Sequence, residues 1–140
     1  MKVLAVDFGD ARTGLAVSDP TGFLTGETTV LHERDVQKVL DAVTAWAKAR
    51  NVERIVVGRP MNMNGTEGFR AEKSAVFAEK LGEQSGIQTV LWDERLSSVG
   101  ANKILSDAGK KKKKQKALVD AVAASLILES YLDYLRAQKL

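Results

Sequence analysis

The spacing of apolar residues changes along the chain, and this change restricts the fold more than any other feature. Residues 3–7 and 14–18 are short runs of strand-forming residues, separated by a turn-like segment around Gly9 and Asp10. After the chain breaks at Pro20 and Gly22, residues 27–31 form a third, weaker run. Three strand-like runs joined by short turns predict an antiparallel meander.

From Asp35 onward the period becomes helical. Asp35 is suited to cap a helix whose apolar residues recur at helical spacing, namely Val36, Val39, Leu40, Val43, Trp46 and Ala47. The elements expected after it are a buried strand at 55–58, a polar loop at 62–68, a helix through Ala71, Ala75, Ala78 and Leu81 that closes near Gly86, and a strand at 89–92. A short helix carrying Val99, Ile104 and Leu105 then stops at Gly109, and a long one spans about residues 117–136.

Strands that alternate with helices pair in parallel through right-handed crossovers. Together with the meander, this order predicts an α/β fold with a mixed five-stranded sheet flanked by helices. The sequence shows no repeat or linker, so we expect residues 1–140 to form a single domain.

The residue types exclude several kinds of chemistry. The chain has no cysteine, and its one histidine, His32, lies in a polar stretch that we interpret as surface. Thiol nucleophiles and thiolate or histidine-rich zinc sites are therefore excluded, and a catalytic triad would depend on a surface histidine. A metal ion would be held by carboxylates, which suit Mg²⁺ or Mn²⁺.

Three acidic residues stand where structure alone would not place them. Asp7 ends an apolar strand, and Glu94 follows the last strand by two residues. Ligand sites in α/β sheets gather at the carboxyl ends of strands, where both acids are expected. Asp120 begins a helical apolar stripe that continues through Ala123, Ala124, Ile127, Leu128 and Tyr131. A charge on such a stripe is costly unless it is paired or bound to a metal.

Each acid also has a structural interpretation. Asp7 could cap the following turn, Glu94 could cap a helix, and Asp120 could pair with Arg12 or Arg95. Taken together, three acids near one edge of the sheet favour a site with two divalent ions, which activate water and stabilise the leaving oxygen of a phosphodiester.

The positive charge is local. Six lysines lie between Lys110 and Lys116, and without them 15 basic residues face 18 acidic ones, a net charge of −3. Such a run is either a solvated segment or a loop that binds polyanions. Its position just before the helix that carries Asp120 favours contact with phosphates.

No segment is expected to enter a membrane. The amino terminus lacks the apolar region of a signal peptide, and the longest apolar stretch, at 121–128, is far too short to cross a bilayer. We therefore expect a soluble, cytoplasmic protein without a membrane partner.

Four segments of the chain resemble the motifs of the YqgF family of ribonuclease H-like proteins. They occur in order, without large insertions, and cover essentially the whole chain. The motifs are Val6-Asp7-Phe8-Gly9 with Arg12 and residues 14–19, then residues 57–68, then residues 92–98, and finally residues 119–124 with 126–128. One departure is Asp10-Ala11, where the family often has a small hydroxyl residue and a lysine.

This resemblance implies a ribonuclease H-like nuclease domain that uses Mg²⁺ or Mn²⁺, with two ions held by Asp7, Glu94 and Asp120. Members of the family are described as Holliday-junction resolvases or as nucleases that mature the small-subunit ribosomal RNA precursor. The expected partner is therefore ribosomal RNA precursor or branched DNA, bound by a monomer or a weak homodimer. The predicted substrate contacts are Arg12, Asn62, Arg70, Arg95, Lys111, Lys112 and Lys113.

Two other functions remain open at this stage. Asp7-Phe8-Gly9 followed by Gly14 resembles the first phosphate loop of sugar kinases and actin-like ATPases, but those proteins need two such halves and this chain supplies one. A non-catalytic ribosome-assembly factor that binds RNA is the second alternative. RNA binding that survives loss of the carboxylates would identify it.

Overall fold

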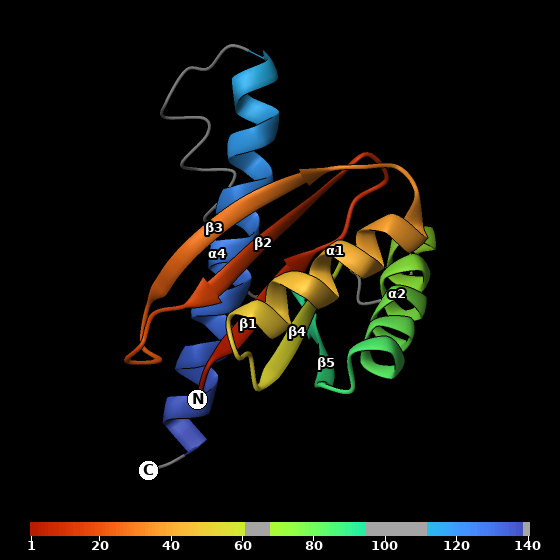
Figure 1. Ribbon diagram of the computed structural model, residues 1–140. Helices are drawn as coiled ribbons and strands as arrows, with labels where there is room; N and C mark the ends of the chain where they lie inside the picture. Colours follow the sequence, from red (N-terminus) through yellow and green to blue (C-terminus); the bar gives the residue numbers. More distant parts are fainter. Residues whose placement is uncertain (61–67, 95–111, 139–140) are drawn as a thin grey trace.

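The computed structural model describes residues 1–60, 68–94 and 112–138, with the backbone alone described over 112–120. Its centre is a five-stranded sheet in the order β3-β2-β1-β4-β5 (Figure 1). The strands are β1 (Val3–Asp7), β2 (Arg12–Ser18), β3 (Thr25–His32), β4 (Arg54–Arg59) and β5 (Gln88–Asp93). The helices are α1 (Val36–Ala49), α2 (Phe69–Ser85) and α4 (Lys112–Gln138).

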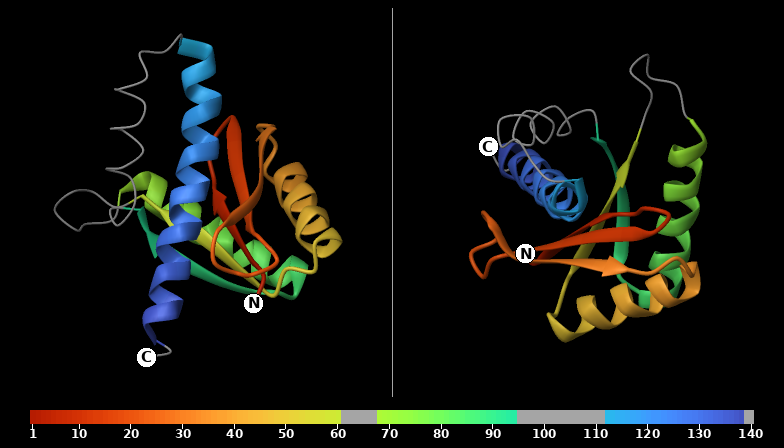
Figure 2. Two further views of the ribbon diagram at one scale, coloured as in Figure 1. Left: turned by 90° about the vertical axis from the view of Figure 1, so that its left-hand side faces the viewer. Right: turned by 90° about the horizontal axis from the view of Figure 1, so that it is seen from above.

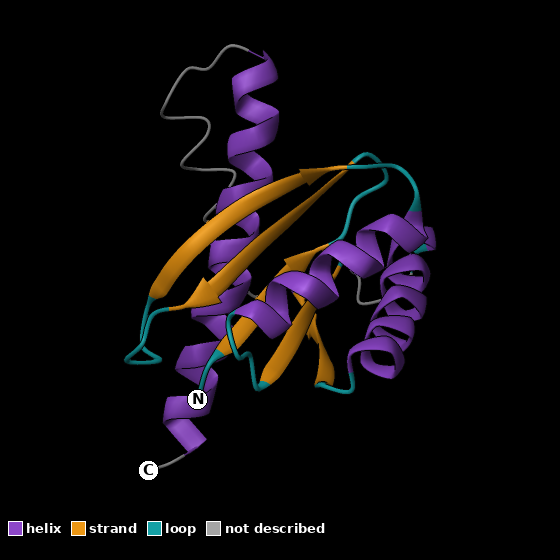
Figure 3. Ribbon diagram, in the orientation of Figure 1, coloured by secondary structure: helices purple, strands orange, loops and turns teal. Residues whose placement is uncertain are grey.

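The sheet is mixed, as predicted. β2 pairs antiparallel with both β1 and β3, whereas β4 pairs parallel with both β1 and β5. The parallel strands are joined through α1 and α2, and the secondary-structure view in Figure 3 shows this division between meander and crossovers. The carboxyl ends of β1, β4 and β5 therefore meet at one edge of the sheet.

Helices cover both faces of the sheet, so the molecule has three layers (Figure 2). α1 and α2 pack on one face against alternate strand residues such as Leu4, Val6 and Leu15. α4 packs on the other face, where its Ala124, Ile127 and Leu128 meet the remaining strand residues. The two-residue alternation of β1 thus divides its side chains between two apolar cores.

Local sequence signals explain where α1 begins. The Asp35 side chain accepts hydrogen bonds from the backbone N–H groups of Gln37 (2.9 Å) and Lys38 (3.2 Å), which confirms the predicted N-cap. Val36 differs from expectation, because it is exposed and lies outside the buried face of the helix.

The predicted boundaries of four strands and of the last helix are wrong. β2, β3, β4 and β5 are all longer than their apolar runs, since backbone pairing continues through polar residues such as Arg12 opposite His32. α4 begins at Lys112, so much of the lysine run predicted as a loop has helical backbone. The predicted short helix carrying Val99, Ile104 and Leu105 lies outside the described residues. Within the described part of the chain, no helix is long and apolar enough to cross a membrane.

The cap of α1 provides a test of the fold. Replacing Asp35 by Ala leaves two N–H groups without their partner, and we expect unfolding free energy to fall by about 1 kcal/mol. Asp35→Asn keeps an accepting oxygen and serves as the matched control. Urea unfolding of both variants measures the difference, and equal stability would show that the cap contributes nothing.

Candidate active site

Two of the predicted acids meet at the carboxyl edge of the sheet. Asp7 is the last residue of β1, and Glu94 directly follows β5. β4 lies between these strands, with Val6 beside Val57 and Gly58 beside Trp92. The backbones that carry the two acids are therefore two strand spacings apart, about 10 Å. Their side chains have to reach across the end of β4.

Gly58 makes this reach possible. A β-carbon built on Gly58 would lie 2.8 Å from Oε1 of Glu94 and 2.6 Å from Cδ1 of Ile127. The space that a side chain would fill is thus occupied by the Glu94 carboxyl and by a buried residue of α4. Glycine in the interior of a strand often marks such a close approach. Any larger residue here would overlap the ends of the Glu94 and Ile127 side chains.

The two carboxyl groups share a hydrogen bond, and the pKa of each is raised above its ordinary value. Burial raises the pKa of Asp7 above its ordinary value, against the opposing effects of the hydrogen bond to Glu94 and the charge of Arg70. Burial, followed by the charge of Asp7 and the hydrogen bond to it, raises the pKa of Glu94 to about 8. Two carboxylates in one poorly solvated place cannot both ionise at low cost. The pair therefore holds a proton. A cation bound in the same place would favour the ionised form of both carboxyl groups.

Two further charged residues act on this pair. The Arg70 guanidinium, from the first turn of α2, lowers the pKa of both acids through its positive charge. The carboxylate of Asp93, the last residue of β5, instead raises the pKa of Glu94. Arg70 is exposed, so it can contact an anion in solution while it acts on the buried acids.

The third predicted acid lies on the helix that covers this face. Ile127 of α4 reaches the space above Gly58, next to Glu94. Asp120 precedes Ile127 by two helical turns, or roughly 10 Å along the axis, and its backbone lies within α4. The position of its side chain is outside the described part of the structure, so its role as a third ligand stays a prediction.

The residues present fit a divalent metal ion. Paired carboxylate oxygens are the donors that Mg²⁺ and Mn²⁺ prefer, and a cation would relieve the repulsion that raises both pKa values. Among the described side chains, no group of three potential metal-ligating residues occurs. A complete ligand set therefore requires a residue beyond Asp7 and Glu94, and Asp120 is the predicted one.

The structure brings some predicted substrate contacts to the site and leaves others untested. Arg70 stands beside the acid pair, whereas Arg12 is half-buried at the start of β2. His32 is exposed, as its polar surroundings predicted. Asn62, Arg95 and Lys111 lie outside the described residues, and for Lys112 and Lys113 only the helical backbone is described.

Gly58 is the site residue that the sequence-based prediction did not single out. A signal for it exists, because a glycine ends the buried run Ile55-Val56-Val57 just where the neighbouring strands carry acids. That reasoning requires the strand order, which places β4 between β1 and β5.

The fold and the acid pair define a class of protein. The fold is ribonuclease H-like, as solved structures of similar shape show. RuvC of Thermus thermophilus in complex with a Holliday junction substrate matches with a TM-score of 0.60 at 14% identity, covering 96% of each chain. The fowlpox virus resolvase in complex with Holliday junction DNA matches with a TM-score of 0.58 at 16% identity, covering 96% of this chain and 99% of the other.

Sequence comparison identifies the family. Residues 1–134 match the model of the RuvX family, described as "Holliday junction resolvase", and the chain belongs to this family. A protein of Carboxydothermus hydrogenoformans is 42% identical over 134 residues, covering 96% of this chain and 97% of its own length. One from Listeria monocytogenes serotype 4b is 42% identical over 135 residues, covering 95% and 98%. Both are named "Putative pre-16S rRNA nuclease". The predicted family and enzyme class are thereby confirmed.

The raised pKa values predict how stability depends on pH. The pKa of Glu94 rises from 4.5 to about 8 on folding, so the folded protein holds this proton more tightly than the unfolded chain does. This contribution to stability is fully present below pH 4.5 and is lost as pH rises through 8. Thermal unfolding in a chelator should therefore show melting temperature falling between these pH values, and added Mg²⁺ should restore it at pH 8.

Asp7→Asn provides the matched variant for this measurement. Removing the Asp7 charge removes one cause of the raised Glu94 pKa. The melting temperature of the variant should therefore change less with pH than that of the wild type. At pH 8, without metal, the variant should melt above the wild type. A lower melting temperature for Asp7→Asn at that pH would contradict repulsion between the two acids.

Proposed function

We propose that this protein is a metal-dependent nuclease that hydrolyses phosphodiester bonds in pre-16S ribosomal RNA, in four-way DNA junctions, or in both. The observation that supports this function is the pair of half-buried carboxyl groups, Asp7 and Glu94, that meet across Gly58 at the carboxyl edge of the sheet. The names of the relatives support the substrate classes. A cytoplasmic location, where ribosomal RNA precursor is found, belongs to the same proposal.

Different residues of the chain have different roles in this proposed function. Asp7, Glu94 and Asp120 hold two Mg²⁺ or Mn²⁺ ions, which supply an activated water and stabilise the leaving oxygen when bound. Arg70 is exposed beside the acid pair, and its planar fork of donors suits a phosphate oxygen. The lysines before and at the start of α4 attract the polyanion, and Arg12, Asn62 and Arg95 contact the strand to be cut. The protein acts as a monomer or weak homodimer.

Cleavage assays test this function directly. A pre-16S RNA fragment and a four-way DNA junction are incubated with the wild type, Asp7→Asn and Asp120→Asn, in Mg²⁺ or Mn²⁺ and in a chelator. Loss of a charge-stabilising group should lower the cleavage rate by roughly 100-fold or more. Binding without cleavage, unchanged by either substitution or by the chelator, would instead establish a non-catalytic RNA-binding protein.

Gly58 provides a second test, aimed at the geometry of the acid pair. In Gly58→Ala the new methyl group would overlap the Glu94 carboxyl and the Ile127 side chain, so the ends of these side chains must shift. A displacement of about 1 Å in a catalytic group can lower the rate by roughly 100-fold. We expect a loss of that size in metal-dependent cleavage.

The same substitution at Gly82 is the matched control. A β-carbon there would lie 3.4 Å from Oγ1 of Thr89, at ordinary contact distance, within α2. Gly82→Ala should keep full activity and gain up to about 1 kcal/mol of stability from helix propensity. Full activity in Gly58→Ala would show that the close approach of Glu94 is not needed.

A further inference from the structure

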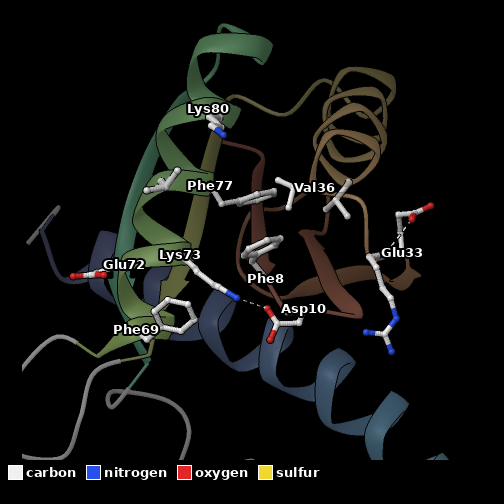
Figure 4. Close-up of a pocket in the computed structure, with 13 residues that line it drawn as sticks. Phe8, Asp10, Glu33, Val36, Phe69, Glu72, Lys73, Phe77 and Lys80 are labelled. Atoms are coloured by element: carbon white, nitrogen blue, oxygen red, sulfur yellow. Dashed lines mark hydrogen bonds and ion pairs between the residues drawn. The ribbon is translucent and has the colours of Figure 1, made fainter.

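A cavity lies at the same end of the sheet as the acid pair but on the opposite face. Its volume is about 480 Å³, and it is bounded by the turn after β1, the segment before α1, and α2 (Figure 4). Asp7 and Phe8 are adjacent in sequence, and Phe8 lines this cavity. The size falls within the range of pockets that bind small organic groups, roughly 300–1,000 Å³.

Part of the cavity wall is apolar and aromatic. Phe8 and Phe77 are stacked, with ring centroids 4.1 Å apart and planes only 8° from parallel. Val36 and Phe69, the first residues of α1 and α2, and Val76 in the middle of α2 also line it and are exposed at 42%, 72% and 50%. Exposed apolar side chains gathered around a cavity indicate a binding site, because leaving such an area in water is unfavourable.

The charges around the cavity do not favour an anion inside it. Arg34, Lys73 and Lys80 are balanced by three acids that also line it, namely Asp10, Glu33 and Glu72. Nζ of Lys73 lies 3.1 Å from Oδ1 of Asp10 and 4.6 Å from the centre of the Phe69 ring. A balanced charge over aromatic walls suits a neutral planar group better than a phosphate.

The cavity is next to the proposed catalytic site. A smaller hollow shares Phe8, Gly9, Asp10 and Lys73 with it and is also lined by Arg70. Arg70 is the residue whose charge acts on both Asp7 and Glu94. A strand with its phosphate at Arg70 would therefore have a neighbouring base within reach of the cavity.

We propose that this cavity binds one unpaired nucleobase of the strand being cut, next to the scissile phosphate. The proposal rests on the proposed nuclease function and deepens it. A base can enter only after it leaves its stack, which costs least where the nucleic acid is single-stranded or distorted. The protein then selects sites that have an unpaired nucleotide beside the cut.

The experiment scans the bases around a mapped cut. Catalytically inactive Asp7→Asn protein is titrated, in Mg²⁺, with the substrate that the wild type cleaves, carrying an abasic nucleotide at each position flanking the cut in turn. An abasic nucleotide at one of these positions should weaken binding about tenfold, which is the contribution of one base stacked on an aromatic side chain. Adding Phe69→Ala should weaken binding of the intact substrate similarly and remove the dependence on that base.

Two control variants separate this cavity from general effects. Phe23→Ala truncates a phenylalanine of similar exposure, 53%, that lies outside the cavity lining, and should keep the abasic dependence. Val76→Glu places a charge on the exposed wall and should act like Phe69→Ala without removing an aromatic ring. The base-binding proposal is overturned if every abasic substrate binds with the same affinity, or if Phe69→Ala and Phe23→Ala change binding equally. In either case, cleavage that depends on Asp7 would still support the proposed nuclease function. Absence of cleavage overturns both.

Discussion

The repulsion between two half-buried carboxyl groups is the interaction on which the rest of the site depends. Asp7 and Glu94 come from strands that are not neighbours, and the glycine that β4 carries between them leaves the space in which the Glu94 carboxyl lies. Without a bound cation the pair retains a proton. Burial makes it unfavourable to ionise both carboxyl groups, and the positive charge of Arg70 opposes this effect. Such an arrangement is poor for stability and suitable for binding divalent metal, so the site itself indicates function.

The two apolar cores hold these acids in place. On one face, α1 and α2 pack against Leu4 and Val6. On the other face, α4 packs against Val3 and Ala5. A strand buried on both sides has little freedom to shift its register, because a slip by one residue would exchange its faces. The backbone of Asp7, which ends this strand, is thereby held in a fixed position next to Glu94.

Hydrophobic periodicity was sufficient to predict the sheet, the Asp35 cap and the edge where Asp7 and Glu94 meet. It misplaced the start of α4, since lysine is a good helix former but carries no apolar signal. It also assigned Val36 to the buried face of α1, whereas that residue lines a cavity. The cavity could not be predicted, because Phe8, Val36 and Val76 come from separate segments and become neighbours only after folding.

The side chains of β1 alternate between the two faces of the sheet, and this alternation continues to Phe8, just after the strand. Asp7 lies on the face covered by α4, where it meets Glu94, and Phe8 lies on the opposite face, stacked on Phe77. Consecutive residues thus connect the acid pair on one face with the cavity on the other. Because one backbone segment carries both, a shift of this turn would change the positions of both together.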